Sequence, residues 1–293
     1  LVHRIAHWAD HKPDAVALSA RDGDGWRRWT WAQYDAGVRD VARGLLALGV
    51  APGECVAIVG DNRPEWVLCE FGIMAVRGIP APIYTTNTDA QTSFIIEHSQ
   101  ARVAICDKKE QLEKYLRCLG EDSAVEHIVV MDELRSDDPR VVTLSGLIER
   151  GSAVPEASLD ERLDGLTDSE TALLIYTSGT TGTPKAVQLT HGAMVAVAEA
   201  MIERIPPLGE PGQYKSVSYL PLCHVAEQVF TNFLHLATGG EVTFCPDIKQ
   251  LKDFLVAARP TLFQGVPRVW EKFQAALEAK LASASPLRRK LAA

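Results

Sequence analysis

The most informative part of this sequence is a loop of small and hydroxylated residues between two apolar runs. Residues 173–191 read Leu173-Leu174-Ile175-Tyr176-Thr177-Ser178-Gly179-Thr180-Thr181-Gly182-Thr183-Pro184-Lys185-Ala186-Val187-Gln188-Leu189-Thr190-His191. The apolar run at the start is typical of a buried strand, and residues 186–189 read as another strand. The sequence therefore predicts that the loop joins two strands.

The composition of this loop favours the binding of a polyphosphate. Gly179 and Gly182 allow positive φ angles and a close backbone approach, so that successive N–H groups can point at one anion. The Thr and Ser hydroxyls add neutral donors, and Lys185 adds a compact positive charge. The spacing is not that of a Walker A loop, because Lys185 follows Gly182 by three residues and leads into a strand. A surface loop of small polar residues is the alternative interpretation.

On both sides of this loop, apolar runs of strand length alternate with amphipathic stretches of helical length. Strands are expected at residues 55–59, 79–83, 102–106, 127–131, 172–177, 216–220, 241–245 and 261–264. Helices are expected at residues 30–48, 64–76, 89–98, 109–119, 191–204, 224–237, 248–258 and 267–284. This alternation is typical of a doubly wound α/β fold with mostly parallel sheets and flanking helices.

Two further features suggest how the chain is divided. Residues 15–19 and 26–29 flank a turn at Arg21-Asp22-Gly23-Asp24-Gly25 and predict an N-terminal hairpin. Residues 134–169 are rich in Asp, Ser, Pro and Gly, with one short helix expected near 144–149, and we interpret them as a connection. The first α/β lobe, residues 1–168, would carry the hairpin, and the second, residues 169–293, would carry the loop.

Composition excludes several classes of protein. With 46% hydrophobic and 23% charged residues, the 293-residue chain resembles an ordinary globular protein rather than a disordered or collagen-like one. Its net charge of −8 argues against a broad nucleic-acid surface. No run approaches the ~20 apolar residues of a membrane-spanning helix. Six cysteines without a CxxC pair predict reduced, mostly buried thiols and a cytoplasmic location.

Residues 176–185 resemble the signature loop of the adenylate-forming, or AMP-binding, superfamily. Four other segments are similar to long-chain fatty-acyl-CoA synthetases, including the bubblegum-type branch: DNRPEW at 61–66, PIYTTN at 82–87, SYLPLCH at 218–224 and GVPRVWEK at 265–272. The resemblance runs from the hairpin to about residue 280. One departure lies beside the loop, where Ala186 stands in place of the family's usual glycine.

The resemblance also implies that this chain is the N-terminal part of a longer enzyme. Family members carry an adenine-contacting segment with an acidic metal ligand, an Asp that binds the ribose, and a mobile C-terminal domain with a catalytic lysine. The sequence contains none of these motifs, and it begins at Leu1 without an initiator methionine or a signal-peptide pattern. We therefore expect a partial N-terminal domain of the acyl-CoA synthetase fold that is inactive by itself.

The activity implied by the resemblance is ATP-dependent activation of a long-chain fatty acid to an acyl-adenylate and then to acyl-CoA. ATP, Mg²⁺ and coenzyme A are the cofactors and co-substrates of this chemistry. Neither step needs a protein nucleophile, so positioning and charge neutralisation are expected to carry catalysis. Two alternatives stay open. One is a fatty-acyl-AMP ligase or another adenylating enzyme, and the other is a non-catalytic module that binds phosphate or acyl groups.

In this reading the loop binds the β- and γ-phosphates of ATP, through Thr177, Ser178, Gly179, Thr180, Thr181, Gly182, Thr183, Pro184 and Lys185. Lys185 would contact phosphate or anchor the loop by pairing with an acidic group, and Thr177 would also contribute to the surroundings of the metal. His224 would lie near the substrate carboxylate and the α-phosphate, at the carboxyl edge of the sheet. The alternative for His224 is a ring that bonds only to solvent or backbone at a helix N-terminus.

The substrate side of the expected site is open to two interpretations. Candidates for an apolar acyl tunnel, which are equally candidates for plain core packing, are Val225, Val229, Phe230, Phe233 and residues 263–266. Arg268 would meet the substrate or cap the sheet. Some relatives have an aromatic gate four positions after the histidine, where this sequence has Gln228. A gate of that type is therefore not expected here.

Two groups of charged or titratable residues lie outside this site. His3, His7 and His11 recur every four residues and would share a helix face, which we interpret as solvated rather than metal-binding. The basic run Arg288-Arg289-Lys290 is interpreted as a solvated surface, with peripheral membrane contact as the alternative.

Overall fold

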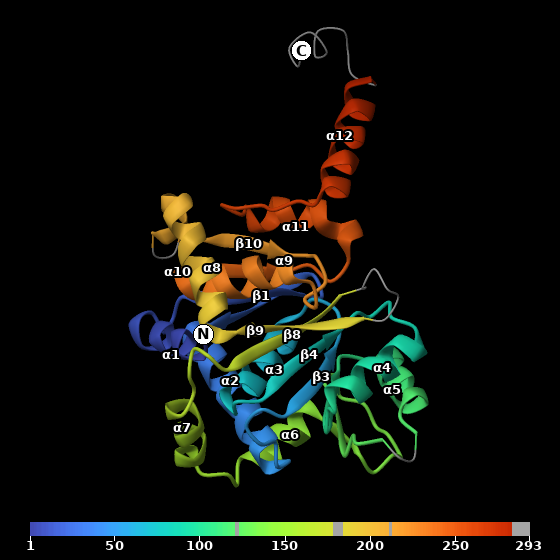
Figure 1. The fold of residues 1–293 in the computed structure, drawn as a ribbon. Helices are drawn as coiled ribbons and strands as arrows, with labels where there is room; N and C mark the ends of the chain where they lie inside the picture. The colour runs from blue at the N-terminus through green and yellow to red at the C-terminus, as the bar shows by residue number, and fades with distance from the viewer. Residues whose placement is uncertain (121–122, 178–183, 211–212, 283–293) are drawn as a thin grey trace. The chain divides into compact units, whose positions relative to one another are not determined.

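The structure is a computed structural model that describes residues 1–120, 123–177, 184–210 and 213–282, and it contains a five-stranded parallel sheet (Figure 1). The strand order is β4-β3-β5-β6-β7. The bounds are β3 Cys55–Val59, β4 Ile79–Ile83, β5 Val103–Cys106, β6 His127–Val130 and β7 Val141–Thr143. The central strands are buried along most of their length, as a parallel sheet with helices on both faces requires.

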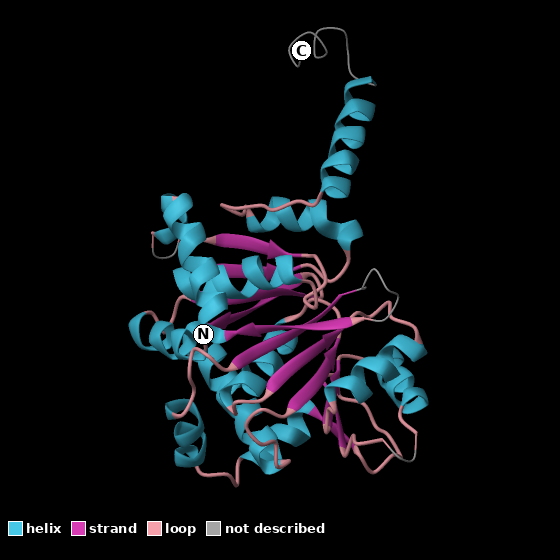
Figure 2. Ribbon diagram, in the orientation of Figure 1, coloured by secondary structure: helices cyan, strands magenta, loops and turns pink. Residues whose placement is uncertain are grey.

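Helices cover both faces of this sheet (Figure 2). Helix α3 (Pro64–Ala75) packs on one face and begins with a proline at its first turn, a position where the missing N–H is not needed. Helices α4 (Asp89–Ser99) and α5 (Lys109–Cys118) pack on the other face, where Ile95 and Tyr115 join the core around Ala104. A capping box between Thr88 and Gln91 fixes the start of α4.

A second sheet has the order β10-β11-β1-β2 and brings together residues from both ends of the chain. Strands β1 (Val16–Asp22), β10 (Lys215–Ser218) and β11 (Glu241–Phe244) are parallel, and β2 (Gly25–Thr30) is antiparallel to β1. Helix α3 lies between the two sheets, since it contacts β1 as well as β3 and β4. It packs closely on α2 (Trp31–Ala47), because a Cβ at Gly72 would lie 2.6 Å from Val41.

The third sheet is the antiparallel pair β8 (Thr171–Thr177) and β9 (Lys185–Thr190). Strand β8 lies beside β4, and Thr177 at its carboxyl end lines the same cavity as Tyr84, which follows β4, so the two strands end at the same edge. The remaining elements are α1 (Val2–His11), α6 (Leu144–Gly151), α7 (Glu156–Asp164), α8 (His191–Arg204), η1 (Pro206–Gly209), α9 (Val225–Glu227), η2 (Gln228–Phe233), α10 (Leu234–Thr238), η3 (Ile248–Gln250), α11 (Leu251–Ala258) and α12 (Pro267–Ala282).

The doubly wound α/β class and the N-terminal hairpin predicted from the sequence are confirmed. The strand expected at residues 261–264 is wrong. Thr261 donates its backbone N–H to Lys215 O at 3.0 Å, but this segment continues as irregular backbone. The helix expected at 224–237 is interrupted, because η2 is a π-helix between α9 and α10. Strand β7 and helix α7 lie in the region that we interpreted as a connection.

The division at residue 168 stays a prediction, although β1 of the first expected lobe pairs directly with β11 of the second. The structure groups residues Leu1–Thr261 in one unit and Leu262–Ala293 in another. The second unit contains α12 and its own aromatic contacts. Phe263 lies 5.5 Å from Trp270 and 5.9 Å from Phe273, measured between ring centroids.

Candidate functional site

A cavity of about 370 Å³ lies where strands β4 and β8 end. Its described walls come from the end of β4, helix α4, the two stems of the loop and the start of α9. They are Tyr84, Asn87, Gln91, Ile95, Ile175, Tyr176, Thr177, Pro184, His224 and Val225. The cavity thus brings together three residues that the sequence singled out for one site, Thr177, Pro184 and His224.

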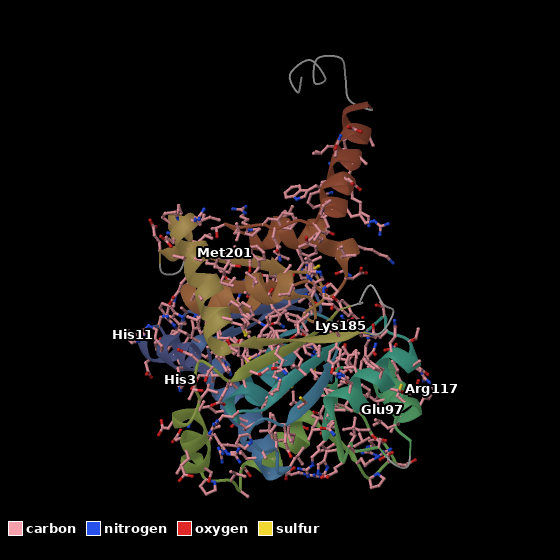
Figure 3. The ribbon with its side chains drawn as sticks, in the orientation of Figure 1. His3, His11, Glu97, Arg117, Lys185 and Met201 are labelled. Atoms are coloured by element: carbon pink, nitrogen blue, oxygen red, sulfur yellow. The ribbon has the colours of Figure 1, made fainter. Side chains whose placement is uncertain are left out.

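The two stems of the loop are held in register by β-sheet pairing. Thr177 ends β8 and lies opposite Lys185, which begins β9, and both side chains are exposed. Figure 3 shows Lys185 at this end of β9. In the described part of the chain, no acidic side chain forms an ion pair with Lys185, so its charge is available to a ligand. Residues 178–183, expected to bind phosphate, lie outside the described residues.

The ring of His224 is oriented by the start of α9. Its Nδ1 accepts the backbone N–H of Ala226 at 3.1 Å, and its own backbone N–H donates to Pro221 O at 2.8 Å. Because Nδ1 is an acceptor, the neutral ring holds its proton on Nε2. The ring is half-buried and lines the cavity. It therefore presents an N–H donor of fixed tautomer beside the stems of the loop. The backbone contact of the alternative interpretation is present, and it serves to orient the ring.

Several walls of the cavity were not identified as site residues from the sequence. Tyr84 and Asn87 follow β4 directly, and burial raises the pKa of Tyr84 to about 12. Burial likewise raises the pKa of Tyr176 to about 12, and its hydroxyl lies 3.1 Å from Nδ1 of His98 on α4. The available signal was the similar segment at 82–87, which ends a strand at the edge where parallel sheets bind ligands.

The residues suggested for an acyl tunnel do not share one environment. Val225 lines the cavity and is exposed, whereas Phe233 is 2% exposed and belongs to the core. Val229 and Phe230 are half-buried and are not among the described lining residues. Gln228, at the position of the gate in some relatives, is fully buried behind the histidine. Residues 263–266 and Arg268 belong to the second unit, where Arg268 is exposed.

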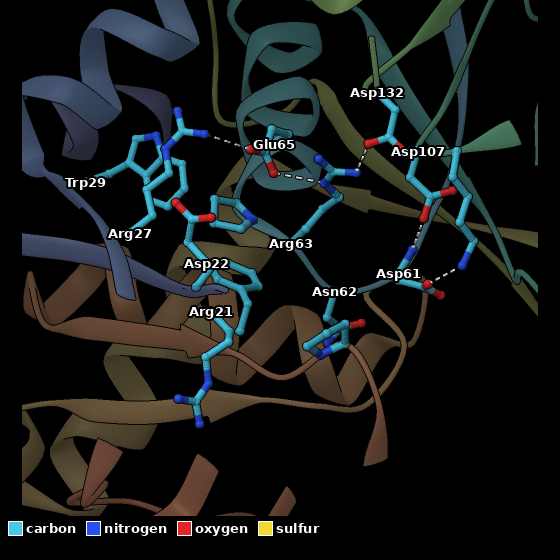
Figure 4. A pocket seen from close by; sticks show the side chains of 15 residues that line it. Arg21, Asp22, Arg27, Trp29, Asp61, Asn62, Arg63, Glu65, Asp107 and Asp132 are labelled. Carbon is cyan, nitrogen blue, oxygen red and sulfur yellow. Dashed lines mark hydrogen bonds and ion pairs between the residues drawn. The ribbon is translucent and has the colours of Figure 1, made fainter. Parts of the chain in front are cut away.

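A second cavity, of about 380 Å³, lies at the carboxyl ends of parallel strands from the five-stranded and the four-stranded sheet (Figure 4). It is rich in ion pairs. Arg63 contacts Glu65 and Asp132, both at 2.8 Å, and Lys108 contacts Asp61 at 2.5 Å. Figure 4 shows Arg63 between Glu65, which lies two residues further along the same segment, and Asp132, which follows β6. Because most of its charges neutralise one another, this cavity is a charge-paired seam between the two sheets.

The seam contains one buried acid that the sequence did not single out. Asp107 follows β5, is 2% exposed, and accepts the backbone N–H of Asp61 at 2.9 Å. Burial is the main cause that raises the pKa of Asp107. Its other oxygen has no partner among the described residues.

The other two groups named from the sequence give simpler results. His3, His7 and His11 are exposed on α1, where Figure 3 labels the first and last of them. The described residues contain no group of three or more His, Cys, Asp or Glu side chains arranged to hold a metal ion. The basic run 288–290 lies outside the described residues. Among the helices that the structure describes, none has the length and apolar character needed to cross a membrane.

Comparison with known proteins gives a consistent picture. The model of the family described as AMP-binding enzyme matches residues 5–292. The chain is 34% identical to the long-chain-fatty-acid–CoA ligase ACSBG2 of Xenopus laevis, over 95% of this chain and 38% of that protein. It is 35% identical to the long-chain-fatty-acid–CoA ligase ACSBG1 of Rattus norvegicus, over 99% of this chain and 41% of that protein. The chain thus spans about two-fifths of the length of these relatives.

Solved structures agree with the fold. A long-chain-fatty-acid-CoA ligase, FadD1, from Archaeoglobus fulgidus superposes with a TM-score of 0.78 at 20% identity, covering 97% of this chain and 54% of that one. The A domain of a carboxylic acid reductase from Segniliparus rugosus, in complex with AMP and a carboxylic acid, gives a TM-score of 0.80 at 20% identity. That match covers 99% of this chain and 52% of the other.

Proposed function

The chain belongs to the family of AMP-binding enzymes, and on this premise we propose that its full-length protein activates long-chain fatty acids with ATP. The acid would first become an acyl-adenylate, with release of pyrophosphate, and the acyl group would then pass to the thiol of coenzyme A. Relatives that match nearly all of this chain are named as long-chain-fatty-acid–CoA ligases. The observation that carries the proposal is that Thr177, Pro184 and His224 line one and the same cavity.

The chain's own groups suit a reaction between two anions. The cation of Lys185 lies at the start of β9 with no described acidic partner, so it can neutralise phosphate charge. The Nε2–H of His224 can donate to an oxygen of the carboxylate or the α-phosphate, because its Nδ1 is already bonded to Ala226. No side chain is required as a nucleophile, so these donors act by positioning and by stabilising developing charge.

The donor set of the cavity fits Mg²⁺ only as an ion carried by the nucleotide. The described lining offers hydroxyl and amide oxygens from Thr177, Asn87 and Gln91, and it contains no carboxylate. Thr177, at the end of β8, is the residue that would contact the ion, alongside phosphate oxygens. When bound, Mg²⁺ would neutralise phosphate charge.

The proposal includes a reducing, cytoplasmic setting, and it leaves open contact with a membrane surface, from which fatty acids could be drawn. The state of the cysteines supports the first point. All six are free, and four of them, Cys69, Cys106, Cys223 and Cys245, are buried. Burial raises the pKa of Cys245 to about 11, which keeps this thiol protonated.

Fatty-acid-dependent exchange of pyrophosphate into ATP, measured on the full-length gene product, tests the adenylation step. We expect Lys185→Ala and His224→Ala each to lower the exchange rate by about 10²–10³-fold, the usual loss for one donor to a developing charge. Lys252→Ala is the matched control, because it removes an exposed lysine from α11, outside the cavity lining.

Three results would bear against the proposal in different ways. Wild-type protein without exchange would refute adenylation, and normal exchange in both cavity variants would refute the site. Exchange without consumption of coenzyme A would restrict the activity to formation of the acyl-adenylate.

A further inference from the structure

The segment that delivers His224 to the cavity is held by buried side chains. Asn62 Nδ2 donates to Leu220 O at 2.7 Å, and Leu220 N donates to an oxygen of Glu227 at 3.1 Å. Closer to the histidine, Leu222 O accepts a hydrogen bond of 2.7 Å from Nε2 of Gln228. Glu227 and Gln228 are 0% exposed. The backbone before His224 is therefore fixed from behind, on the side away from solvent.

The amide of Gln228 is itself locked in one orientation. Its Nε2 also donates to Glu70 Oε1 at 2.8 Å, and its Oε1 accepts from Asn232 Nδ2 at 2.8 Å. Asn232 Nδ2 makes a second bond, of 2.6 Å, to Glu70 Oε2, which closes a triangle of three side chains. Turning the amide of Gln228 over would set its oxygen against Leu222 O, an acceptor, and its nitrogen against Asn232 Nδ2, a donor, so these two contacts hold the amide in one orientation.

The partner at the base of the triangle is an acid on the central helix. Glu70 lies on α3 and is 0% exposed. Its described partners in the network are the two amides. Burial, and to a lesser extent the charge of Glu70, raises the pKa of the buried Tyr34 hydroxyl on α2. Burial raises the pKa of Glu70 to about 8, against the effect of the two amide donors. Burial of an acid whose described partners are two amides costs free energy. We therefore interpret Glu70 as a group that holds these amides in place.

The backbone of the same segment departs from regular helix. Gln228 begins the π-helix η2, which runs to Phe233 between two short α-helical pieces. A π-turn within a helix is uncommon and re-aims the side chains that it carries. Here Gln228 and Asn232 both reach Glu70 from this turn.

We propose that Gln228, locked by Glu70 and Asn232, is a positioning residue for the adenylation reaction, since it fixes the Leu222 carbonyl and so the place of His224. The inference rests on the proposed function of the cavity. Gln228 acts through the backbone and does not line the cavity. Displacing it would also displace the N–H of Ala226, two residues before it, that orients the His224 ring.

The test compares Gln228→Ala with Thr238→Val in the full-length gene product. Thr238 is also buried, and its hydroxyl bonds to Leu234 O at 2.7 Å, but it does not touch the segment before His224. We expect Gln228→Ala to lower kcat by about 10- to 100-fold, as a misplaced reacting group does, and to leave the KM for ATP unchanged. Thr238→Val should lose stability and keep its kcat.

A near-isosteric variant provides a readout that a merely structural role would not change. In Gln228→Glu, the new carboxyl can donate to Leu222 O only when it is protonated. The kcat of this variant, relative to wild type at the same pH, should therefore be highest at low pH and fall as pH rises.

Glu70→Gln/Gln228→Glu is the control for the acid pair. It avoids two adjacent carboxylates, so it should recover stability, yet the donor to Leu222 O still depends on protonation, so the fall of kcat with pH should remain. A wild-type kcat in folded Gln228→Ala, an equal loss of kcat in Thr238→Val, or a Gln228→Glu profile that matches wild type would overturn the inference. Failure of the proposed function would appear instead as a wild-type protein without exchange.

Discussion

The exposed polar side chains at the stems of the loop and the buried polar side chains that hold the segment before His224 differ in their hydrogen-bond and ion-pair partners. At the stems of the loop, Thr177 and Lys185 are exposed, and Lys185 has no described acidic partner. In the segment before His224, the buried side chains of Asn62 and Gln228 bond directly to backbone carbonyls. An exposed cation without a described acidic partner is available to a ligand, whereas a buried amide that bonds to the backbone organises its surroundings. Under the proposed function, groups of the first kind would contact substrate, and groups of the second kind would position the first.

The largest effect on stability is expected from pH, through the buried acids. The pKa of Glu70 is raised from 4.5 to about 8 by burial, so between those values the folded state holds a proton that the unfolded state releases. The free energy of unfolding that Glu70 contributes should therefore fall as pH rises, by about 1.4 kcal/mol per pH unit at most.

Denaturant unfolding of wild type and Glu70→Gln between about pH 6 and pH 8 measures this contribution. The difference between the two curves should change by about 2 kcal/mol in favour of the variant as pH rises. Using the difference cancels the other shifted groups, such as His191, whose pKa is lowered to about 4 by burial. Parallel curves would show that Glu70 titrates normally.

A smaller effect is expected from Asn62, the other buried amide of the comparison. Its side chain is 6% exposed and donates to Ser218 Oγ at 2.8 Å and to Leu220 O at 2.7 Å. Asn62→Ala leaves both acceptors without this donor and should lower the free energy of unfolding by about 1–2 kcal/mol. Thermal unfolding measures this loss.

Gln274→Ala is the control for Asn62→Ala, because it removes an exposed amide that bonds to Glu278 at 2.8 Å on α12. It should change stability by less than about 0.5 kcal/mol. Equal losses in the two variants would contradict the distinction between buried and exposed amides.

The smallest effect is expected in the charge-paired seam. Lys108 and Asp61 are each about one-third exposed and their charged atoms lie 2.5 Å apart. Lys108→Ala should lower the free energy of unfolding by less than about 1 kcal/mol, and added salt should reduce the difference from wild type. A larger loss that salt does not reduce would mean that this ion pair contributes as much to the free energy of unfolding as the buried amides do.

The sequence predicted the elements of the fold more fully than their irregularities. Strand β4 and helix α8 lie at the residues expected, because apolar periodicity and capping act over a few neighbouring positions. The π-helix η2 was missed, because residues 224–237 have the apolar spacing of a regular helix and the wide turn follows from contacts with α3. Residues 261–264 have the composition of a strand, but their backbone is irregular, and Thr261 donates its N–H to Lys215 O on β10.

The candidate site divides in the same way. Thr177, Pro184 and His224 were named from loop chemistry and from resemblance, and these signals are local. Tyr84, Asn87 and Gln91 were not named, because nothing in their own segment shows that β4 ends beside β8. Whether residues 178–183 bind phosphate stays a prediction.

By itself, the sequence determined the α/β class, the hairpin and the order of most strands and helices, since each depends on patterns that neighbouring residues share. Only the tertiary structure decided that β1 pairs with β11, that Asn62 bonds to Leu220, and that Glu70 bonds to Gln228. The last two pairs are each 158 residues apart in the chain. Hydrogen bonds at such separations leave no periodic signal, because they arise when packed helices and sheets exclude water and each buried donor must find an acceptor.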